Sequence, residues 1–470
     1  MRCALGLALA VSVLLLRSAC SAGTLAERLQ ALSHSTRPDD IALLEQIRAG
    51  KAALASQRES ARRDGLKLAF TDLVPASAPA GENAATAWST LVWCWRRHPP
   101  PPTLRRLLTA LHDGHFPTSA ELARLRPLGA EQSTVNAAIS RVVARRKCAF
   151  ARDWSGGGIP GASEHSAGLL AAGWLRARAL LAAADGDDSR ACAALESIFP
   201  IASHLASDPG VRSLRVGLEV RGIAASGFAT LLQARGSRAG VARRVRGILE
   251  RHGSRLRPTG ALETEAALVA GEFRRLREPV SRRGRLPLFG GLMVEPLDPR
   301  LTFDPASLGP ADRSLCAAFL DAAEARYLAY ARRGVAVTRQ AIRFAGSALH
   351  ELAIELRQVP RQPLNEFAVR LLPGAWDVFE EDLRERTRQA VLVCAASALE
   401  YRVAHGRFPR SLDEAMPRVL LDPYSNRAYQ YRIEGNGFVL HSLGTSGRYS
   451  PPPRPRAIAR TDVAFRYPEP

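Results

Sequence analysis

Apolar residues near the C-terminus recur at the spacing of an amphipathic helix. The helix is expected to begin near Arg386 and to end at Gly406, because glycine suits the left-handed position that follows a helix. The proline at position 409 then prevents the helix from resuming. The apolar residues that this spacing places on one helical face are Leu392, Ala395, Leu399 and Val403.

A β-hairpin is predicted after this helix. Tyr429, Tyr431 and Ile433 alternate with polar residues, as in a half-buried strand. The sequence Glu-Gly-Asn-Gly at 434–437 suits a tight reversal, because glycine and asparagine tolerate positive φ. Phe438 then opens the partner strand.

Two local signals connect the helix to the hairpin. Ser411 and Glu414 have the spacing of a capping box, which predicts one short helical turn. Residues 422–426, Asp-Pro-Tyr-Ser-Asn, have the composition of a turn. The region from 386 to 448 is therefore predicted to form a small helix-plus-hairpin module.

This module resembles the soluble C-terminal part of the major pseudopilin of type II secretion. The resemblance rests on three ordered phrases, within LEYRVAHGRFPRSLDEA, DPYSNRAYQY and SLGTSG, and covers about sixty of the 470 residues. It implies a folding or docking unit in an envelope assembly. Alternatively, the module arose independently as a stable end of the chain.

The sequence also departs from the pseudopilin pattern. No prepilin-peptidase site or long apolar filament helix precedes Arg386, and one residue is added between Asp422 and Tyr429. The family's acidic calcium loop is replaced by a stretch in which only Asp462 is acidic, so we expect no calcium ion. The resemblance thus implies a borrowed module and not a filament subunit.

The rest of the chain reads as closely spaced helices. One or two helices are expected in 24–66, the second of them starting at Pro38, and a tryptophan-rich helix follows near Trp88. Further helices are expected in the ranges 166–251, 259–277, 311–330 and 334–358.

The predicted fold class is mainly α. We expect an irregular stack of α-hairpins, with a tetratricopeptide-like turn at 186–195, and a small C-terminal α+β module. The order of elements resembles that of a group of uncharacterised exported bacterial helical proteins. The predicted ranges are a signal peptide at 1–22, an N-terminal helical region at 23–150, a helical body at 151–377, the pseudopilin-like helix and hairpin at 378–448, and a Pro/Arg tail with a last strand at 449–470.

The N-terminus predicts export. An apolar run at 4–16 lies behind Arg2, and small residues continue to Gly23, which is typical of a signal peptide cleaved after Ala22. Two alternatives stay open, namely lipid modification of Cys20 and an uncleaved membrane anchor. The expected location is the periplasm or the cell envelope.

Charge changes the choice of partner. The formal net charge is +20, yet only three of the 65 basic residues are lysine, and the arginines are spread over nearly every helix. We therefore do not expect nucleic acid, and we expect protein partners in the envelope together with anionic polymers or lipid head groups. Local basic clusters lie at 141–147, 243–257 and 274–285, where a solvated helix face is the ordinary explanation.

No catalytic, cofactor or metal residue is predicted. The chain contains neither a Gly-x-Ser-x-Gly elbow nor a His-Glu-x-x-His motif, and the glycine run at 155–161 lacks the ending of a phosphate loop. The pair His112 and His115 beside Asp113 is a weak metal candidate. The five cysteines after residue 22 have no paired spacing, so neither zinc nor a particular disulfide is predicted.

Two functional hypotheses follow. The first is a non-catalytic scaffold or interaction protein of the cell envelope. The alternative is an exported hydrolase or carbohydrate-active enzyme, with a site in a groove beside the Gly/Pro-rich stretch at 279–310. Convergent acidic or histidine side chains in one pocket would favour the enzyme, and a pocket of apolar and arginine residues would favour binding.

Overall fold

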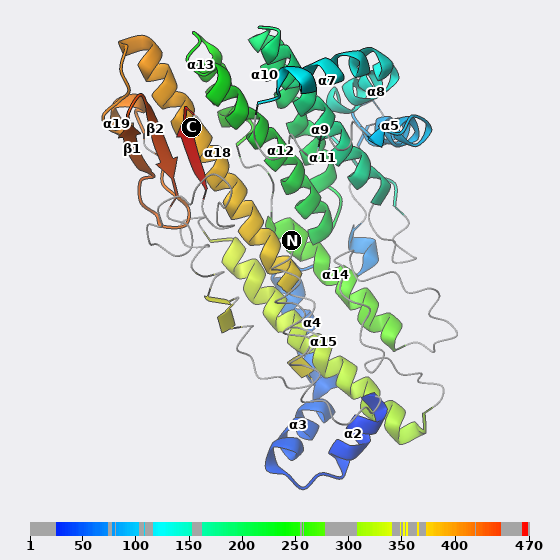
Figure 1. The fold of residues 1–470 in the computed structure, drawn as a ribbon. Coiled ribbons are helices and arrows are strands. Elements are labelled where there is room, and N and C mark those ends of the chain that lie inside the picture. Colours follow the sequence, from blue (N-terminus) through cyan, green and yellow to red (C-terminus); the bar gives the residue numbers. More distant parts are fainter. Residues whose placement is uncertain are drawn as a thin grey trace.

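The computed structural model shows a mainly helical chain with a small antiparallel sheet near its C-terminus, which confirms the predicted fold class (Figure 1). The helices line up into an elongated molecule, with the sheet against one end of a long helix. The structure describes residues 25–73, 78–79, 81–102, 108, 116–152, 162–253, 256, 258–277, 308–340, 348, 351–352, 354–355, 364–365, 373–418, 420–442 and 463–468.

The helical elements follow one another in a stack of neighbouring pairs. Consecutive helices pack together along much of the chain, as α9 does with α10 and α11 with α12. Their bounds are α2 Leu25–Ser33, α3 Pro38–Arg48, α4 Gly50–Arg63, α5 Ala85–Arg97, α7 Ser119–Glu131, α8 Ser133–Val143, α9 Ala162–Ala184, α10 Asp188–Glu196, α11 Ile198–Ala206, α12 Val211–Arg235, α13 Val241–Arg251, α14 Pro258–Leu276, α15 Pro310–Thr338, α18 Pro373–His405 and α19 Leu412–Ala415, with a 3-10 turn η1 at Phe70–Leu73.

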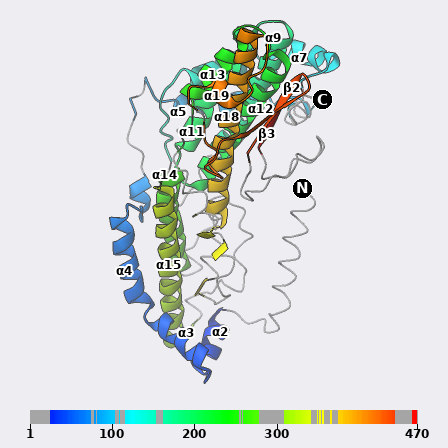
Figure 2. The ribbon, with the colours of Figure 1, turned by 90° about the vertical axis from the view of Figure 1, so that its left-hand side faces the viewer.

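Two apolar cores organise these helices. The first core joins α5, α8 to α13, the later part of α18 and the sheet. The second joins α2 to α4, α14 and α15 at the other end of the molecule (Figure 2). Both α12 and α18 contribute to each core, because Val211 of α12 and Val378 of α18 lie in the second core while later residues of both helices lie in the first. These two helices, which pack against each other, therefore hold the molecule together.

The sheet has the strand order β1-β2-β3, with β1 at Gln430–Glu434, β2 at Gly437–His441 and β3 at Ala464–Tyr467. Both pairings are antiparallel, with Tyr431 opposite Leu440 and Leu440 opposite Phe465. The expected hairpin and the expected last strand are thus both present.

Phe438 is the centre of the sheet's packing. Its side chain is fully buried, and four aromatic rings surround it with centroid distances from 5.2 Å to 6.0 Å. Aromatic contacts at such distances add stabilisation beyond the buried area. The four rings belong to Phe408, Tyr431, Phe465 and Tyr467.

Several local predictions are confirmed. Trp88, Leu91 and Trp95 form a buried face of α5, and Pro38 opens α3. Gly186 adopts a φ of 86° in the turn between α9 and α10, and Gly406 ends α18 with a φ of 72°.

Other predictions about element boundaries are wrong. The helix expected from Arg386 begins at Pro373, and the break expected after Tyr330 does not occur, because α15 continues to Thr338. The range 24–66 holds three helices instead of one or two. Helix α15 continues because Gly334 and Val335 keep its buried face in the second core.

Two details of the C-terminal module also differ from expectation. Glu414 accepts the backbone N–H of Arg410 (3.0 Å) and the hydroxyl of Ser411 makes no cap bond, so the predicted capping box does not form. Ile433 is 43% exposed, although the alternation placed it on the buried face with Tyr429. Tyr429 and Tyr431 pack in the first apolar core, whereas Ile433 lies outside that core and faces solvent.

Candidate functional site

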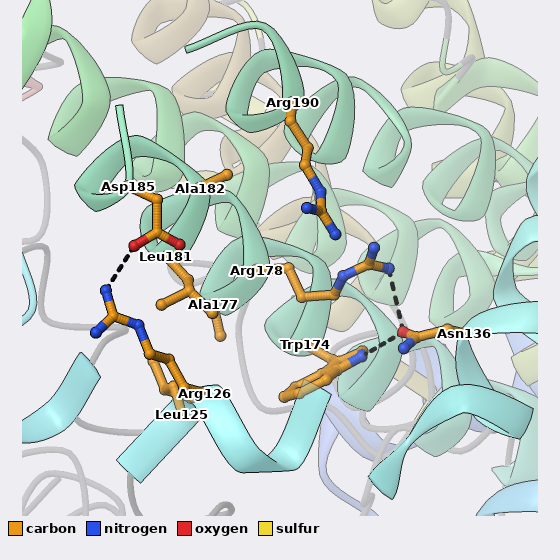
Figure 3. Close-up of a pocket in the computed structure, with 10 residues that line it drawn as sticks. All are labelled: Leu125, Arg126, Asn136, Trp174, Ala177, Arg178, Leu181, Ala182, Asp185 and Arg190. Carbon is orange, nitrogen blue, oxygen red and sulfur yellow. Dashed lines mark hydrogen bonds and ion pairs between the residues drawn. The ribbon is translucent and has the colours of Figure 1, made fainter. Parts of the chain in front are cut away.

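A cleft between α7, α8, α9 and α10 is the candidate functional site (Figure 3). Its volume is about 240 Å³. Arginine guanidinium groups and one carboxylate reach it from three of the four helices, over a lining of leucine and alanine. The lining residues are Leu125, Arg126, Asn136, Trp174, Ala177, Arg178, Leu181, Ala182, Asp185 and Arg190.

Asn136 of α8 fixes one side of the cleft. Its Oδ1 atom accepts a hydrogen bond from Trp174 Nε1 (2.8 Å) and another from Arg178 Nη1 (3.1 Å). Trp174 and Arg178 are four residues apart on α9, so the helix places both side chains on the face toward α8. Because Trp174 is buried, the amide it holds is positioned by the core, and that amide in turn positions the Arg178 guanidinium.

Arg190 approaches from the first turn of α10. Asp187 caps this helix, and its Oδ1 accepts the backbone N–H of Arg190 (2.9 Å). The capped turn fixes the point from which the exposed Arg190 side chain leaves, and Figure 3 shows its guanidinium on the same side of the cleft as that of Arg178.

The two guanidinium groups raise the positive potential of the cleft. Burial lowers the pKa of Arg178, and the neighbouring charge of Arg190 lowers it further. Neither side chain meets a carboxylate among the residues that the structure describes. The carboxylate at the rim, Asp185, is paired with Arg126 at 2.5 Å. The arrangement therefore offers donors to an anion and leaves its own acid neutralised.

A second cavity lies between α13, α18 and the segment after α19, with a volume of about 430 Å³. Leu249, Val393, Met416 and Leu420 make it largely apolar. Arginines border this cavity as well: Arg246, Arg386 and Arg418. Its carboxylate Glu250 lies 3.7 Å from Arg246, and Arg386 pairs with Asp382 at 2.7 Å.

Several polar groups away from these cavities are paired inside the protein. Arg152 bridges Asp208 (2.9 Å) and Glu164 (3.1 Å), and Arg221 donates to Gln389 Oε1 (2.9 Å) between α12 and α18. These bonds satisfy polar groups that the folded core encloses.

Two histidines of the described part of the chain are buried, and both are neutral at pH 7. Burial lowers the pKa values of His165 and His204 to about 4. Trp88 Nε1 lies 3.4 Å from His204 Nδ1, and His204 Nε2 lies 3.0 Å from the carbonyl oxygen of Arg145. His204 is thus held between a core tryptophan and the backbone and faces no cavity described above.

The five cysteines that the structure describes are free thiols. Cys94, Cys192, Cys316 and Cys394 are buried, and Cys148 is half-buried. Burial raises the pKa of Cys148 to about 12, because the apolar surroundings and the carboxylate of Asp208 disfavour the thiolate. Thiolate chemistry is therefore suppressed at this residue.

The basic clusters noted in the sequence fall into different environments. Arg243 and Arg246 both pair with Glu400, and Arg251 pairs with Glu196. These contacts are side-chain bridges between helices. The cleft in Figure 3 uses none of the three clusters, and the sequence analysis did not identify it. The four-residue spacing of Trp174 and Arg178 shows only that these two side chains share a helix face.

Several sequence candidates lie outside the described residues. These are the signal peptide at 1–22, the pair His112 and His115, the glycine run at 155–161 and all but the end of the groove segment at 279–310. Within the described part of the chain, no three His, Cys, Asp or Glu side chains group as metal ligands.

Comparison with known proteins gives no match, since no family model, no curated protein and no solved structure is similar to this chain. The pseudopilin resemblance therefore stays a prediction. One helix of the described part, Ser163–Ala184 within α9, is long and apolar enough to cross a membrane, but 67% of its most apolar window is buried inside the protein. The core helix of a globular protein satisfies the same length and composition criteria.

Proposed function

We propose that this chain is an exported, non-catalytic interaction protein of the cell envelope that holds anionic partners. One observation carries the proposal: both cavities described above are bordered by arginines, while Asp185 and Glu250, the carboxylates that line them, lie beside arginines. General acid–base chemistry needs an acid or base that is free to exchange protons with a substrate. Sites of this composition instead favour recognition of phosphate or carboxylate groups.

The C-terminal module supports a protein partner. Helix α18 belongs to both apolar cores, so the sheet is held firmly against the body. Strand β1 lies at an edge of the sheet and pairs with β2 on one side. No strand of the described residues pairs with its other side, whose backbone donors and acceptors would suit a strand from a partner, a common mode of recognition. We propose that the pseudopilin-like module docks in this way to a secretion-type envelope assembly.

Export and docking are tested together in cells. The tagged chain is expressed in a bacterium with a type II secretion system, the fractions are separated, and the N-terminus of the recovered chain is determined by mass spectrometry. We expect the chain in the periplasmic or envelope fraction. Recovery in the cytoplasm with an intact N-terminus would contradict the proposed location.

A matched pair of substitutions tests the edge strand. Ile433→Lys places a charge on β1, where lysine discourages strand addition, and Val403→Lys places the same charge at a similarly exposed position of α18 (43% and 44% exposed). After crosslinking in the envelope fraction, recovery of secretion-system components should fall at least tenfold with Ile433→Lys and stay within twofold with Val403→Lys. Equal recovery with both variants would refute docking through β1.

A further inference from the structure

The Figure 3 cleft contains a half-buried arginine, Arg178, that meets no carboxylate among the described residues. Several half-buried arginines elsewhere do meet a carboxylate within 3.2 Å, for example Arg152, Arg235, Arg277 and Arg386. Arg178 is half-buried too, but its protein partner is the neutral amide of Asn136. A partly desolvated guanidinium without an anion is unfavourable, since removal from water is not repaid by an opposite charge.

The neighbourhood of Arg178 increases this imbalance. Arg190 brings a second positive charge, and its electrostatic effect on Arg178 is part of the reason that the Arg178 pKa is lowered. A bound anion reverses the effect, because one negative group between two guanidiniums is attracted by both. A guanidinium has five N–H donors, of which Arg178 uses one on Asn136.

We propose that the cleft binds a small oxyanion, a phosphate or carboxylate group, between Arg178 and Arg190. The inference rests on the proposed binding function and names the ligand class of that site. Asn136 orients Arg178 as the inner donor, and Arg190 closes on the anion from the exposed rim.

The size and rim of the cleft limit the ligand. Pockets for drug-sized molecules span roughly 300–1,000 Å³, and this cleft is smaller, at about 240 Å³. At the rim, Asp185 is paired with Arg126, so that arginine is not free to hold a second anionic group. The cleft therefore fits one compact anionic group, whether on a free small molecule or at the end of a lipid head group, and not an extended polyanion.

Calorimetric titration of the purified chain tests the site with inorganic phosphate and acetate at constant ionic strength. Arg190→Gln and Arg178→Gln should each weaken binding of the better probe at least tenfold. Arg141→Gln is the matched control, because it removes one exposed arginine charge from α8 outside the cleft. We expect the control to bind within twofold of the unchanged chain.

Two results would overturn the inference. One is equal weakening by Arg190→Gln and Arg141→Gln, which would assign anion binding to overall charge. The other is absence of phosphate and acetate binding by a chain with the circular dichroism spectrum of a folded helical protein. Arg190 is exposed, so its variant keeps the test valid even where Arg178→Gln disturbs folding.

Vesicles of phosphatidylglycerol distinguish a head group from a free anion. Loss of sedimentation with these vesicles in Arg190→Gln but not in Arg141→Gln supports the head group as source, and phosphate binding without vesicle binding supports a free anion. If the chain binds envelope partners but binds neither phosphate nor acetate, the cleft ligand is refuted and the proposed function is not. Phosphate binding in the cleft by a chain that binds no envelope partner would support the cleft ligand and refute the proposed function.

Discussion

Glu265→Gln is expected to stabilise the protein above pH 7 and to change little near pH 4.5. Glu265 lies on α14, and its Oε2 accepts the backbone N–H of Val211, the first residue of α12, at 3.0 Å. The neighbouring Thr264 hydroxyl accepts the N–H of Gly210 at 2.9 Å. Two side chains of α14 thus bind the amides that the start of α12 leaves without helical partners.

The sign follows from the proton balance. Burial raises the pKa of Glu265 from 4.5 to about 7, and the Val211 N–H bond opposes this rise only in part. Between pH 4.5 and pH 7, Glu265 keeps its proton in the folded chain but loses it in the unfolded chain. The contribution of protonated Glu265 to stability is therefore fully present below pH 4.5 and is lost as the pH rises through 7. At about 1.4 kcal/mol per pKa unit, the loss at pH 8 is about 3 kcal/mol.

Glutamine keeps an acceptor oxygen for Val211 and cannot ionise. Urea unfolding followed by circular dichroism at pH 5 and pH 8 should therefore show a gain of roughly 3 kcal/mol at pH 8 and of less than about 1 kcal/mol at pH 5. Burial also raises the pKa values of Asp208 and Asp382, so the difference between variant and unchanged chain isolates Glu265.

Glu59→Gln on α4 is the control, because Glu59 is exposed and an exposed substitution usually changes stability by less than about 0.5 kcal/mol. A Glu265→Gln variant that is no more stable at pH 8 than the unchanged chain would refute the argument. So would an equal gain at both pH values, since the cost of ionisation acts only at the higher one.

Three further predictions concern packing, the turn and the thiols. Gly50→Ala should lower the free energy of unfolding by about 1–3 kcal/mol, because its Cβ would lie 2.4 Å from the Ala318 carbonyl oxygen; a gain in urea unfolding, as helix propensity alone predicts, would contradict the close contact. Asp422→Ala should cost about 2 kcal/mol and speed amide exchange in 422–442, because buried Asp422 accepts the hydroxyl of Ser442 at 2.8 Å and the N–H of Tyr424 at 3.0 Å; unchanged exchange would refute this role. Cys148 should react with a thiol reagent at pH 8 far more slowly in the folded than in the unfolded chain, because burial disfavours its thiolate; equal rates would contradict its environment.

The C-terminal sheet was predictable because its local signals agree. Tyr431 and Ile433 alternate with polar residues along β1, the apolar run Phe438, Val439 and Leu440 forms β2, and Gly435 takes the positive φ of 55° that the turn needs. Each signal acts over a few residues, and the burial of Phe438 by aromatic side chains brings the same residues together.

The start of α18 escaped prediction because its buried face mixes apolar residues, among them Val378 and Phe379, with polar ones. Asp382, Glu385 and Gln389 are buried at helical spacing, but a search for apolar periodicity reads them as solvent-facing. Their hydrogen bonds explain the burial: Arg386 pairs with Asp382 at 2.7 Å, and Arg388 with Glu385 at 2.9 Å. The sequence cannot show which charges are satisfied inside a core, because their other partners come from distant helices.

The cleft was beyond prediction for a related reason. Asn136, Arg178 and Arg190 come from three helices, and only the packing of α8 and α10 against α9 brings them together. Within one helix the sequence does show that Trp174 and Arg178 share a face. It does not show that an amide of α8 holds both.

Where an arginine lies is more informative in this protein than how many there are. Glu324 of α15 is fully buried between Arg58 of α4 (2.6 Å) and Arg277 (2.8 Å), the residue that follows α14, so one acid ties three helices of the second core. Removing one partner of a buried ion pair costs about 3–5 kcal/mol, because the remaining charge stays buried. Part of the basic surplus is therefore structural and unavailable to a polyanion. The arginines that remain to bind an anion are those without a carboxylate, and Arg178 combines that property with burial and a fixed orientation.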